Sequence, residues 1–200
     1  MAVALVVFGY LCGAIPSGVL LARTAGIDVR RAGSGNIGAT NVARTAGLRL
    51  GLLTLIADAA KGILPVVAAR LVAGGGATPA ATGIAAFLGH LFPPTLGFAG
   101  GKGVATALGV SLALYPLATL PAIVAFAVTL ALSGWVSLGS MIAASLTPVA
   151  VLGLGYPRPM LWASIVMAVL IVIRHRDNVA RMIWGHEPKV LLKKQATPGK

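Results

Sequence analysis

The sequence predicts an all-α integral membrane protein, folded as a single domain over residues 1–200. Hydrophobic residues make up 58% of the chain and charged residues only 10%, and the mean hydropathy is +0.93. Soluble domains carry about 25% charged residues, and a chain this apolar could not cover its own surface with polar groups. The apolar residues also fall in long runs, as in helices that cross a bilayer.

Seven apolar segments follow one another along the chain, and each is a candidate membrane helix. They are roughly residues 2–22, 51–73, 79–98, 104–115, 118–133, 138–155 and 159–173. The first segment has no basic residue before Arg23, whereas a secretory signal begins with positive charge. We therefore expect a helix there, kinked near Pro16. A span needs about 20 residues, so several of these helices are expected to be short or tilted.

The positions of the basic residues indicate how many times the chain crosses the membrane, because cytoplasmic loops carry an excess of Lys and Arg. They gather in the first loop (Arg23, Arg30, Arg31, Arg44 and Arg49) and in the tail (Arg174, Arg176, Arg181, Lys189, Lys193, Lys194 and Lys200). The two regions share a side only if the number of crossings is odd. Residues 104–132 could form one long helix, but a break near Tyr115 and Pro116 gives seven. We predict seven transmembrane helices, with the N-terminus outside and residues 175–200 in the cytoplasm. Five crossings with two re-entrant segments is the alternative.

The most unusual stretch is residues 33–41, a loop of glycines, hydroxyls and amides without an acid. Glycine lets backbone N–H groups approach an anion closely, and short polar side chains add further donors. The candidate phosphate ligands are Ser34, Gly35, Asn36, Gly38, Thr40 and Asn41, with the charge of Arg44 beside them. The loop therefore predicts a phosphate pocket at a membrane surface.

A second glycine-rich motif covers residues 97–106 and includes Gly101 and Lys102. It is not a nucleotide-binding P-loop, because three residues rather than four separate Gly97 from Gly101, and Gly103 stands where a hydroxyl is needed. Glycines before a helix still offer an electropositive N-terminus to an anion, and Lys102 adds a mobile charge. The alternative is an ordinary cytoplasmic lysine beside a flexible turn.

The third motif, residues 174–181, follows the last apolar segment directly. If the helix continued, His175 and Asn178 would share one face at a spacing of three residues. A basic helix that binds anionic lipid headgroups would explain the arginines, but neither His175 nor Asn178. We therefore take both, with Arg181, as candidate site residues. Glu187 lies beyond this motif and is expected to pair with an arginine of the first loop.

Asp58 and Lys61 lie one helical turn apart inside the second apolar segment. A charge near the bilayer centre costs about 2.5–3.5 kcal/mol, and pairing reduces that cost. The two residues are either a structural pair facing the bundle interior or a support behind the loop at 33–44. Ser140, at the start of the sixth helix, is a weaker candidate phosphate ligand, and Ser137 is weaker still.

Several chemistries are disfavoured by what the chain contains. Its four acids, three histidines and one cysteine form neither a paired-carboxylate hydrolase site nor a zinc signature. No nucleophile elbow of the form Gly-x-Ser-x-Gly occurs. We expect no metal, no cofactor and no nucleic-acid partner, and we expect a monomer.

The three motifs resemble those of the bacterial acyl-phosphate-dependent glycerol-3-phosphate acyltransferases, the PlsY family. The resemblance rests on residues 33–44, 101–106 and 175–181, in that order, and extends from Gly13 to Glu187. It implies a seven-helix protein of the bacterial inner membrane whose motifs face the cytoplasm. It also implies acyl transfer from acyl phosphate to the 1-hydroxyl of sn-glycerol 3-phosphate, a step of phospholipid biosynthesis that gives lysophosphatidate and phosphate.

Within this interpretation the loop at 33–41 is expected to hold one phosphate, that of the donor. The catalytic set would be Arg44, Lys102, His175 and Asn178, which bind glycerol phosphate or neutralise the departing charge. His175 could be the general base, or a substrate phosphate could take the proton. We favour the second, because nearby arginines disfavour an imidazolium.

Two rivals come from other classes of protein. An anion transporter would share the helix count and the glycine breaks, but transporters commonly show internal repeats and a site at the midplane. A lipid-binding scaffold would use the basic tail, but this function would not explain why the loop at 33–41 has so few large side chains.

Overall fold

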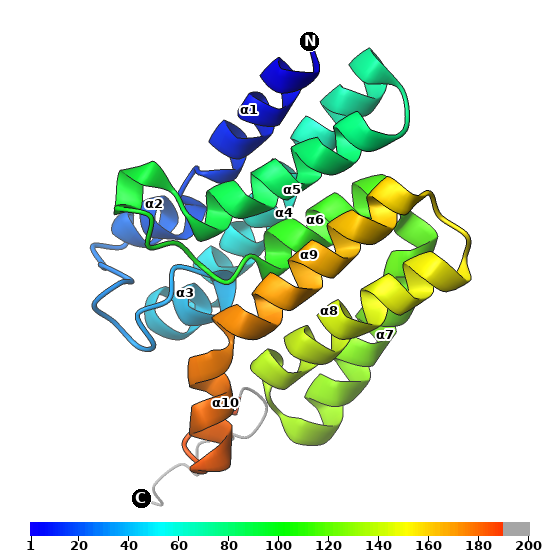
Figure 1. The fold of residues 1–200 in the computed structure, drawn as a ribbon. Helices are drawn as coiled ribbons and strands as arrows, with labels where there is room; N and C mark the ends of the chain where they lie inside the picture. The colour runs from blue at the N-terminus through cyan, green and yellow to red at the C-terminus, as the bar shows by residue number, and fades with distance from the viewer. Residues whose placement is uncertain (190–200) are drawn as a thin grey trace, which may run out of the picture.

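The computed structural model describes residues 1–189, which form a bundle of helices without a strand (Figure 1). Residues 190–200, with Lys193, Lys194 and Lys200 of the predicted tail, lie outside the described residues. The α-helices are α1 (Ala2–Gly13), α2 (Ser17–Arg23), α3 (Ala39–Ala46), α4 (Leu48–Ala73), α5 (Ala77–Leu91), α6 (Val104–Leu114), α7 (Pro116–Ser133), α8 (Val136–Gly153), α9 (Arg158–Arg174) and α10 (Arg176–Ile183). A short 3-10 helix, η1 (Pro94–Leu96), follows α5.

Each predicted apolar segment contains a helix, but the helices differ in length. In the described part, four have the length and hydropathy of a membrane span: Ala2–Arg23 taken through its break, α4, α7 and α8. The pair of α9 and α10 makes a fifth only if it is counted as one span bent by 48°. Helices α5 and α6 have 15 and 11 residues, fewer than the roughly 20 that a straight span needs.

Prolines set the breaks between helices. The kink predicted near Pro16 is a full break between α1 and α2, and the predicted hairpin break is confirmed, since α6 ends at Leu114 and α7 begins at Pro116. A proline suits the first position of a helix because that N–H needs no partner. The helix predicted over 79–98 is too long. It ends at Leu91, because Pro93 and Pro94 cannot continue the hydrogen-bond ladder.

Glycines bring the helices into backbone contact. A Cβ atom on Gly13 would lie 1.8 Å from the carbonyl oxygen of Ala86, so α1 packs directly on α5. One on Gly109 would lie 2.1 Å from the carbonyl oxygen of Ala59, which joins α6 to α4 in the same way. Small residues permit this close packing in membrane helices. Large apolar side chains such as Leu71 and Leu132 are instead 83% and 84% exposed, as suits contact with lipid.

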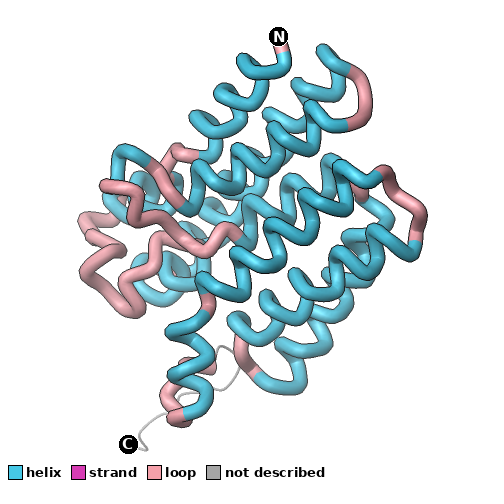
Figure 2. Tube along the Cα trace, viewed as in Figure 1, coloured by secondary structure: helices cyan, strands magenta, loops and turns pink. Residues whose placement is uncertain are grey.

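The polar motifs lie at one end of the bundle. The long connections over residues 24–38 and 92–103 lie at this end with α3 and α10, whereas the short connections over 74–76 and 154–157 lie at the other end (Figures 1 and 2). The ends of α5 and α9 and the starts of α6 and α8 meet there, which brings all three sequence motifs together.

Candidate functional site

A chain of hydrogen bonds joins the second motif to the third. The ammonium group of Lys102, in the loop before α6, donates to Oδ1 of Asn178 on α10. Nδ2 of Asn178 donates to Oε1 of Glu187 at 2.6 Å, and Nε of Arg181 donates to Oε2 of Glu187 at 2.8 Å. Lys102 and Asn178, which are 76 positions apart in the sequence, therefore meet, as expected if the motifs share one side of the membrane.

Glu187 is the centre of this cluster, which the sequence did not reveal. It also accepts a hydrogen bond from Oγ of Ser137 at 2.6 Å, and the indole N–H of Trp135 donates to its backbone carbonyl. Burial would raise the pKa of the Glu187 carboxyl, but hydrogen bonds from Ser137, Asn178 and Arg181 outweigh burial and lower that pKa. The ionised carboxylate thus holds α10 against the start of α8.

Two expectations about these side chains need correction. Ser137, ranked below Ser140 from sequence, belongs to the cluster, whereas Oγ of Ser140 donates to the Val136 carbonyl of its own helix at 2.8 Å. Glu187 pairs with Arg181 of α10 rather than with an arginine of the first loop. The one feature of the sequence that could have pointed to Glu187 is the small number of acidic residues, since it is one of only four in the chain.

Lys102 is the most perturbed cation of this cluster. Its burial lowers the pKa of the ammonium group from 10.5 to about 8, which Glu187 opposes and Arg181 and Arg174 reinforce. An ammonium group has three N–H donors, and the structure shows one of them bonded, to Asn178. Lys102 therefore offers a partly desolvated charge with donors to spare, which suits a phosphate oxygen.

The turn that carries Lys102 is clamped from two sides. From α9, Arg174 donates to the carbonyl of Gly100 at 2.7 Å and to that of Gly101 at 2.9 Å. From α5, the His90 carbonyl accepts the N–H of Gly101 at 3.2 Å. A Cβ on Gly101 would lie 2.2 Å from Nε2 of His90, so only glycine fits. The N–H that was predicted to meet a phosphate is therefore engaged in holding the turn.

His175 lies at the junction of α9 and α10. The helix does not continue straight through this residue, because the axes of α9 and α10 bend by 48°. The side chain is buried, and Nδ1 donates to the Ile171 carbonyl at 2.7 Å. Burial, with a smaller contribution from Lys102, lowers the pKa of the imidazole to about 4. The ring is thus neutral near pH 7, and Nε2 is its remaining acceptor.

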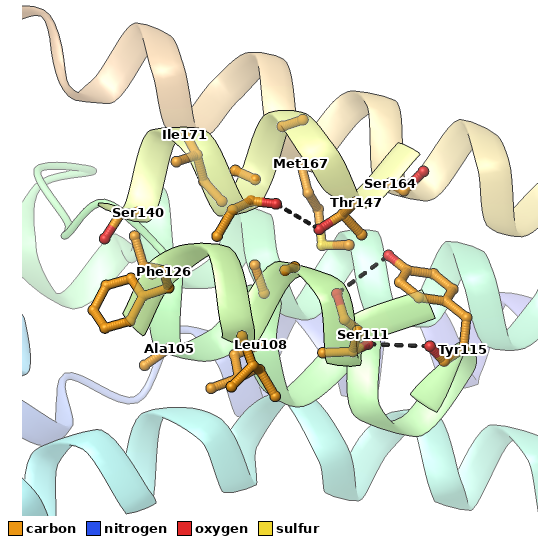
Figure 3. A pocket seen from close by; sticks show the side chains of 18 of the residues that line it. Ala105, Leu108, Ser111, Tyr115, Phe126, Ser140, Thr147, Ser164, Met167 and Ile171 are labelled. Atoms are coloured by element: carbon orange, nitrogen blue, oxygen red, sulfur yellow. Dashed lines mark hydrogen bonds between the residues drawn. The ribbon is translucent and has the colours of Figure 1, made fainter. Parts of the chain in front are cut away.

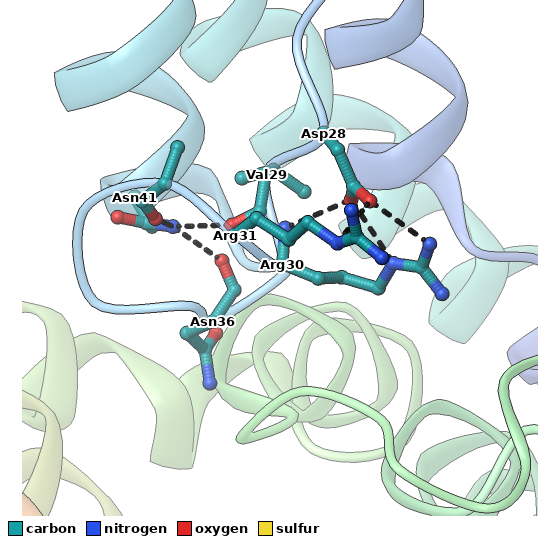
Figure 4. Close-up of polar contacts among 7 residues, drawn as sticks. Asp28, Val29, Arg30, Arg31, Asn36 and Asn41 are labelled. Carbon is teal, nitrogen blue, oxygen red and sulfur yellow. Dashed lines mark hydrogen bonds and ion pairs between the residues drawn. The ribbon is translucent and has the colours of Figure 1, made fainter.

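Asn41 organises the loop at 33–41. Its Nδ2 lies within hydrogen-bond distance of the carbonyls of Val29, Ala32 and Asn36, at 3.1, 3.0 and 2.8 Å, and its Oδ1 accepts the N–H of Ser34 at 2.9 Å (Figure 4). The side chain is 2% exposed. Asn41, predicted as a phosphate ligand, is thus engaged within the loop, where it fixes the shape that other residues present.

Other donors of the loop remain available to a ligand. Oδ1 of Asn36 accepts the N–H of Gly38 at 2.9 Å, and its amide nitrogen points away from the loop (Figure 4). Ser34, Thr40 and Arg44 are exposed. The flanking Arg30 and Arg31 instead lie 3.0 and 3.8 Å from the carboxylate of Asp28.

The buried pair predicted in the second apolar segment is confirmed. Nζ of Lys61 lies 2.9 Å from Oδ1 of Asp58 and donates to the Ile15 carbonyl, also at 2.9 Å. Ile15 lies in the break before α2. Helix α2 packs directly against the loop at 33–41, since a Cβ on Gly18 would lie 1.9 Å from the Ile37 carbonyl oxygen. Nδ1 of His90 lies 3.8 Å from Asp58. The pair therefore links α4 to structures behind both glycine motifs.

An apolar cavity of about 240 Å³ lies beside the cluster, between α6, α7, α8 and α9 (Figure 3). One end of it is lined by Ala105, Ser140 and Ile171. These residues lie next to the cluster, because Ala105 follows Lys102 by three positions and the Ile171 carbonyl accepts from His175. The cationic cluster thus lies beside one end of the apolar cavity. Among residues 1–189, no group of three His, Cys, Asp or Glu side chains is arranged to hold a metal ion.

Comparison with known proteins gives consistent matches over nearly the whole chain. The family model described as glycerol-3-phosphate acyltransferase matches residues 3–185. A glycerol-3-phosphate acyltransferase of Anaeromyxobacter dehalogenans (strain 2CP-1 / ATCC BAA-258) is 49% identical over 194 residues, which cover 93% of this chain and 96% of that protein. One from Geobacter sulfurreducens is 47% identical, with 89% and 92% covered.

Two crystal structures of PlsY (YgiH), an integral membrane glycerol 3-phosphate acyltransferase, have the same fold. The glycerol 3-phosphate form has a TM-score of 0.91 at 39% identity, with 94% of this chain and 95% of that chain covered. The lysophosphatidic acid form has a TM-score of 0.88 at the same identity, with 94% of each chain covered.

Proposed function

The chain belongs to the PlsY family of integral membrane glycerol-3-phosphate acyltransferases, and from that premise we propose that it uses acyl phosphate as the acyl donor and sn-glycerol 3-phosphate as the acceptor. The products are lysophosphatidate and inorganic phosphate. The observation that carries the proposal is the meeting of a cationic cluster with an apolar cavity, which matches a donor with a phosphate at one end and a hydrocarbon chain at the other.

The proposed roles follow from the donors that remain available. The exposed side of the loop, with Ser34, Asn36 and Thr40, holds the phosphate of the acyl donor. Lys102, with Arg181, whose charge acts on it, binds the glycerol phosphate and offsets the charge that develops on the leaving group. Arg44, which is exposed beside the loop, is assigned to the same task. Asn41 and Gly101 act as positioning residues, because their donors hold the loop and the turn in shape.

The reaction needs no covalent intermediate with the enzyme. The 1-hydroxyl oxygen forms a bond to the acyl carbonyl carbon, the bond from that carbon to the phosphate oxygen breaks, and the phosphate leaves. The hydroxyl proton passes to a phosphate oxygen of the substrate. His175 is a weak base, since its pKa is about 4, so we assign its Nε2 the task of accepting a hydrogen bond and orienting the hydroxyl. Loss of rate in His175→Ala at unchanged affinity for glycerol phosphate would instead make His175 the base.

We propose that the chain crosses the bacterial inner membrane seven times, with the N-terminus outside and the site facing the cytoplasm. The clustering of polar motifs at one end of the bundle supports this orientation. Single cysteines introduced at the exposed positions Ser34 and Arg176 should react with an impermeant maleimide from the cytoplasmic side only. Cysteines at Gly75 and Arg158 should react from the opposite side only. Labelling of Ser34 and Arg176 from different sides would reject the topology.

The choice of donor is tested with the purified protein and labelled glycerol 3-phosphate. Acyl phosphate should support formation of lysophosphatidate, whereas acyl-CoA and acyl-carrier protein should not. Equal or faster transfer from acyl-CoA would overturn the choice of donor. Uptake of glycerol 3-phosphate into sealed vesicles without acylation would favour a transporter instead.

A further inference from the structure

The apolar cavity has two different ends. Ala105, Ser140 and Ile171 lie at the end beside Lys102 and His175, and Tyr115 and Ser111 lie at the other (Figure 3). Among its nineteen lining residues, most are apolar, and the hydroxyls of Ser140 and Thr147 donate to carbonyls of their own helix. A cavity with satisfied polar groups and apolar walls suits a hydrocarbon chain that enters from the cluster.

Tyr115 forms a rigid wall at the far end. It is the single residue between α6 and α7, and it is fully buried. Its hydroxyl lies 3.3 Å from Oγ of Ser111, and its ring packs edge-on against Tyr156 with centroids 6.1 Å apart. The backbone of Tyr115 forms the turn between α6 and α7, and Ser111 and Tyr156 contact its side chain. Tyr115 therefore cannot move aside without disrupting this turn.

We propose that Tyr115 sets the upper limit of acyl-chain length in this enzyme, an inference that rests on the proposed acyl transfer. Ten residues separate Ala105 from Tyr115, which corresponds to about 15 Å of helix. An extended alkyl chain with C–C bonds of about 1.5 Å advances roughly 1.25 Å per carbon, so about twelve carbons lie between the two ends. Longer chains must leave through the side of the cavity, where the lining residues Leu55 and Ile123 are 40% and 41% exposed.

The closed end and the open side of the cavity together predict how kcat/KM depends on the length of the acyl donor. Each methylene that fits the cavity gains close packing in place of looser lipid contacts, and each one diverted past Tyr115 into lipid gains no such packing. The value of kcat/KM should therefore rise with donor length until the chain reaches Tyr115, and then stop rising or fall.

The test measures kcat/KM for a series of saturated acyl phosphates from eight to twenty carbons. In Tyr115→Leu, which shortens the wall, we expect the optimum to move to longer chains. Ala144→Leu fills the cavity one helical turn beyond Ser140 and should move the optimum to shorter chains. The matched control is Tyr115→Phe, which keeps the ring and should keep the wild-type profile.

The outcomes separate this inference from the proposed function. An unchanged optimum in Tyr115→Leu would overturn the role of Tyr115, as would a wild-type profile that keeps rising beyond the length of the cavity. If Tyr115→Leu does not fold, the wild-type profile decides, because an optimum well beyond about twelve carbons would exclude a limit at Tyr115. An unchanged optimum in Ala144→Leu would show that the chain does not enter the cavity. Absence of transfer from every acyl phosphate in wild-type protein would reject the proposed function first, and the inference with it.

Discussion

The ion pair of Asp58 with Lys61 and the cluster around Lys102 differ in how completely their charged side chains are paired. Asp58 and Lys61 are 2% and 6% exposed, and Lys61 bonds both the carboxylate and a backbone carbonyl. Lys102 is only partly buried and shows one hydrogen bond, to Asn178. Breaking a buried ion pair strongly destabilises a fold, because it leaves an unpaired buried charge, whereas a desolvated charge with spare donors can bind a ligand. We therefore expect the first group to govern stability and the second to govern activity.

The largest effect on activity is expected from Lys102→Ala. Removal of one donor from a preorganised anion site typically lowers kcat by about 10²–10³-fold. The melting temperature in detergent should stay close to that of wild type, because a partly exposed side chain with one hydrogen bond contributes little to folding. Near-normal turnover would remove Lys102 from the site, and a large fall in melting temperature would make it a structural residue.

The buried pair should show the opposite behaviour. Lys61→Met leaves the carboxylate of Asp58 without its partner, and breaking one side of a buried pair costs about 3–5 kcal/mol. The double variant Asp58→Asn/Lys61→Met removes both charges and should recover much of the lost thermal stability. Arg158→Met, at an exposed position, is the control. If Lys61→Met unfolds at the wild-type temperature, the pair is not what links the helices.

The pH dependence of kcat/KM sharpens the account of Lys102. The ammonium form binds phosphate, and burial lowers the pKa of Lys102 to about 8, so it is protonated below that pH and neutral above it. We expect kcat/KM to fall about tenfold per pH unit above pH 8. Glu187 raises this pKa, so Glu187→Gln should move the fall to lower pH. A profile that stays flat to pH 10 would show that Lys102 titrates normally or does not bind the substrate.

The smallest effects are expected in the glycine loop, where two asparagines can be compared. Asn41→Ala removes the hydrogen bonds that shape the loop, each with a net contribution of about 0.5–1.5 kcal/mol, and should both raise KM for acyl phosphate and lower the melting temperature. Asn36→Ala removes one such hydrogen bond, from the N–H of Gly38, and should raise KM with a smaller fall in melting temperature. Arg31→Ala, whose side chain is 89% exposed, should change neither. If Asn36→Ala matches Arg31→Ala, the loop does not hold the donor.

The sequence predicted the helices and the meeting of the three motifs well, because apolar runs, prolines and glycines act locally. The break at Tyr115 and the ion pair of Asp58 with Lys61 followed from such local patterns. The bend at His175 and the place of Glu187 did not. Glu187 depends on a hydrogen bond with Ser137, which lies 50 positions away in the sequence.

The sequence could not distinguish residues that bind the substrate from residues that hold the loop in shape. Asn41 and Asn36 lie in the same polar loop, and only the structure shows that one is buried and engaged with three carbonyls while the amide nitrogen of the other points outward. The apolar cavity could not be predicted from the sequence either, since its walls come from five helices whose side chains are ordinary apolar residues of membrane helices.

The most direct test of the account is to measure both products in one reaction of purified wild-type protein with dodecanoyl phosphate and glycerol 3-phosphate. We predict that lysophosphatidate and inorganic phosphate form in equal amounts and that Lys102→Ala, at an unchanged melting temperature, forms neither at a comparable rate. Release of phosphate without lysophosphatidate, or equal product from Lys102→Ala, would contradict it.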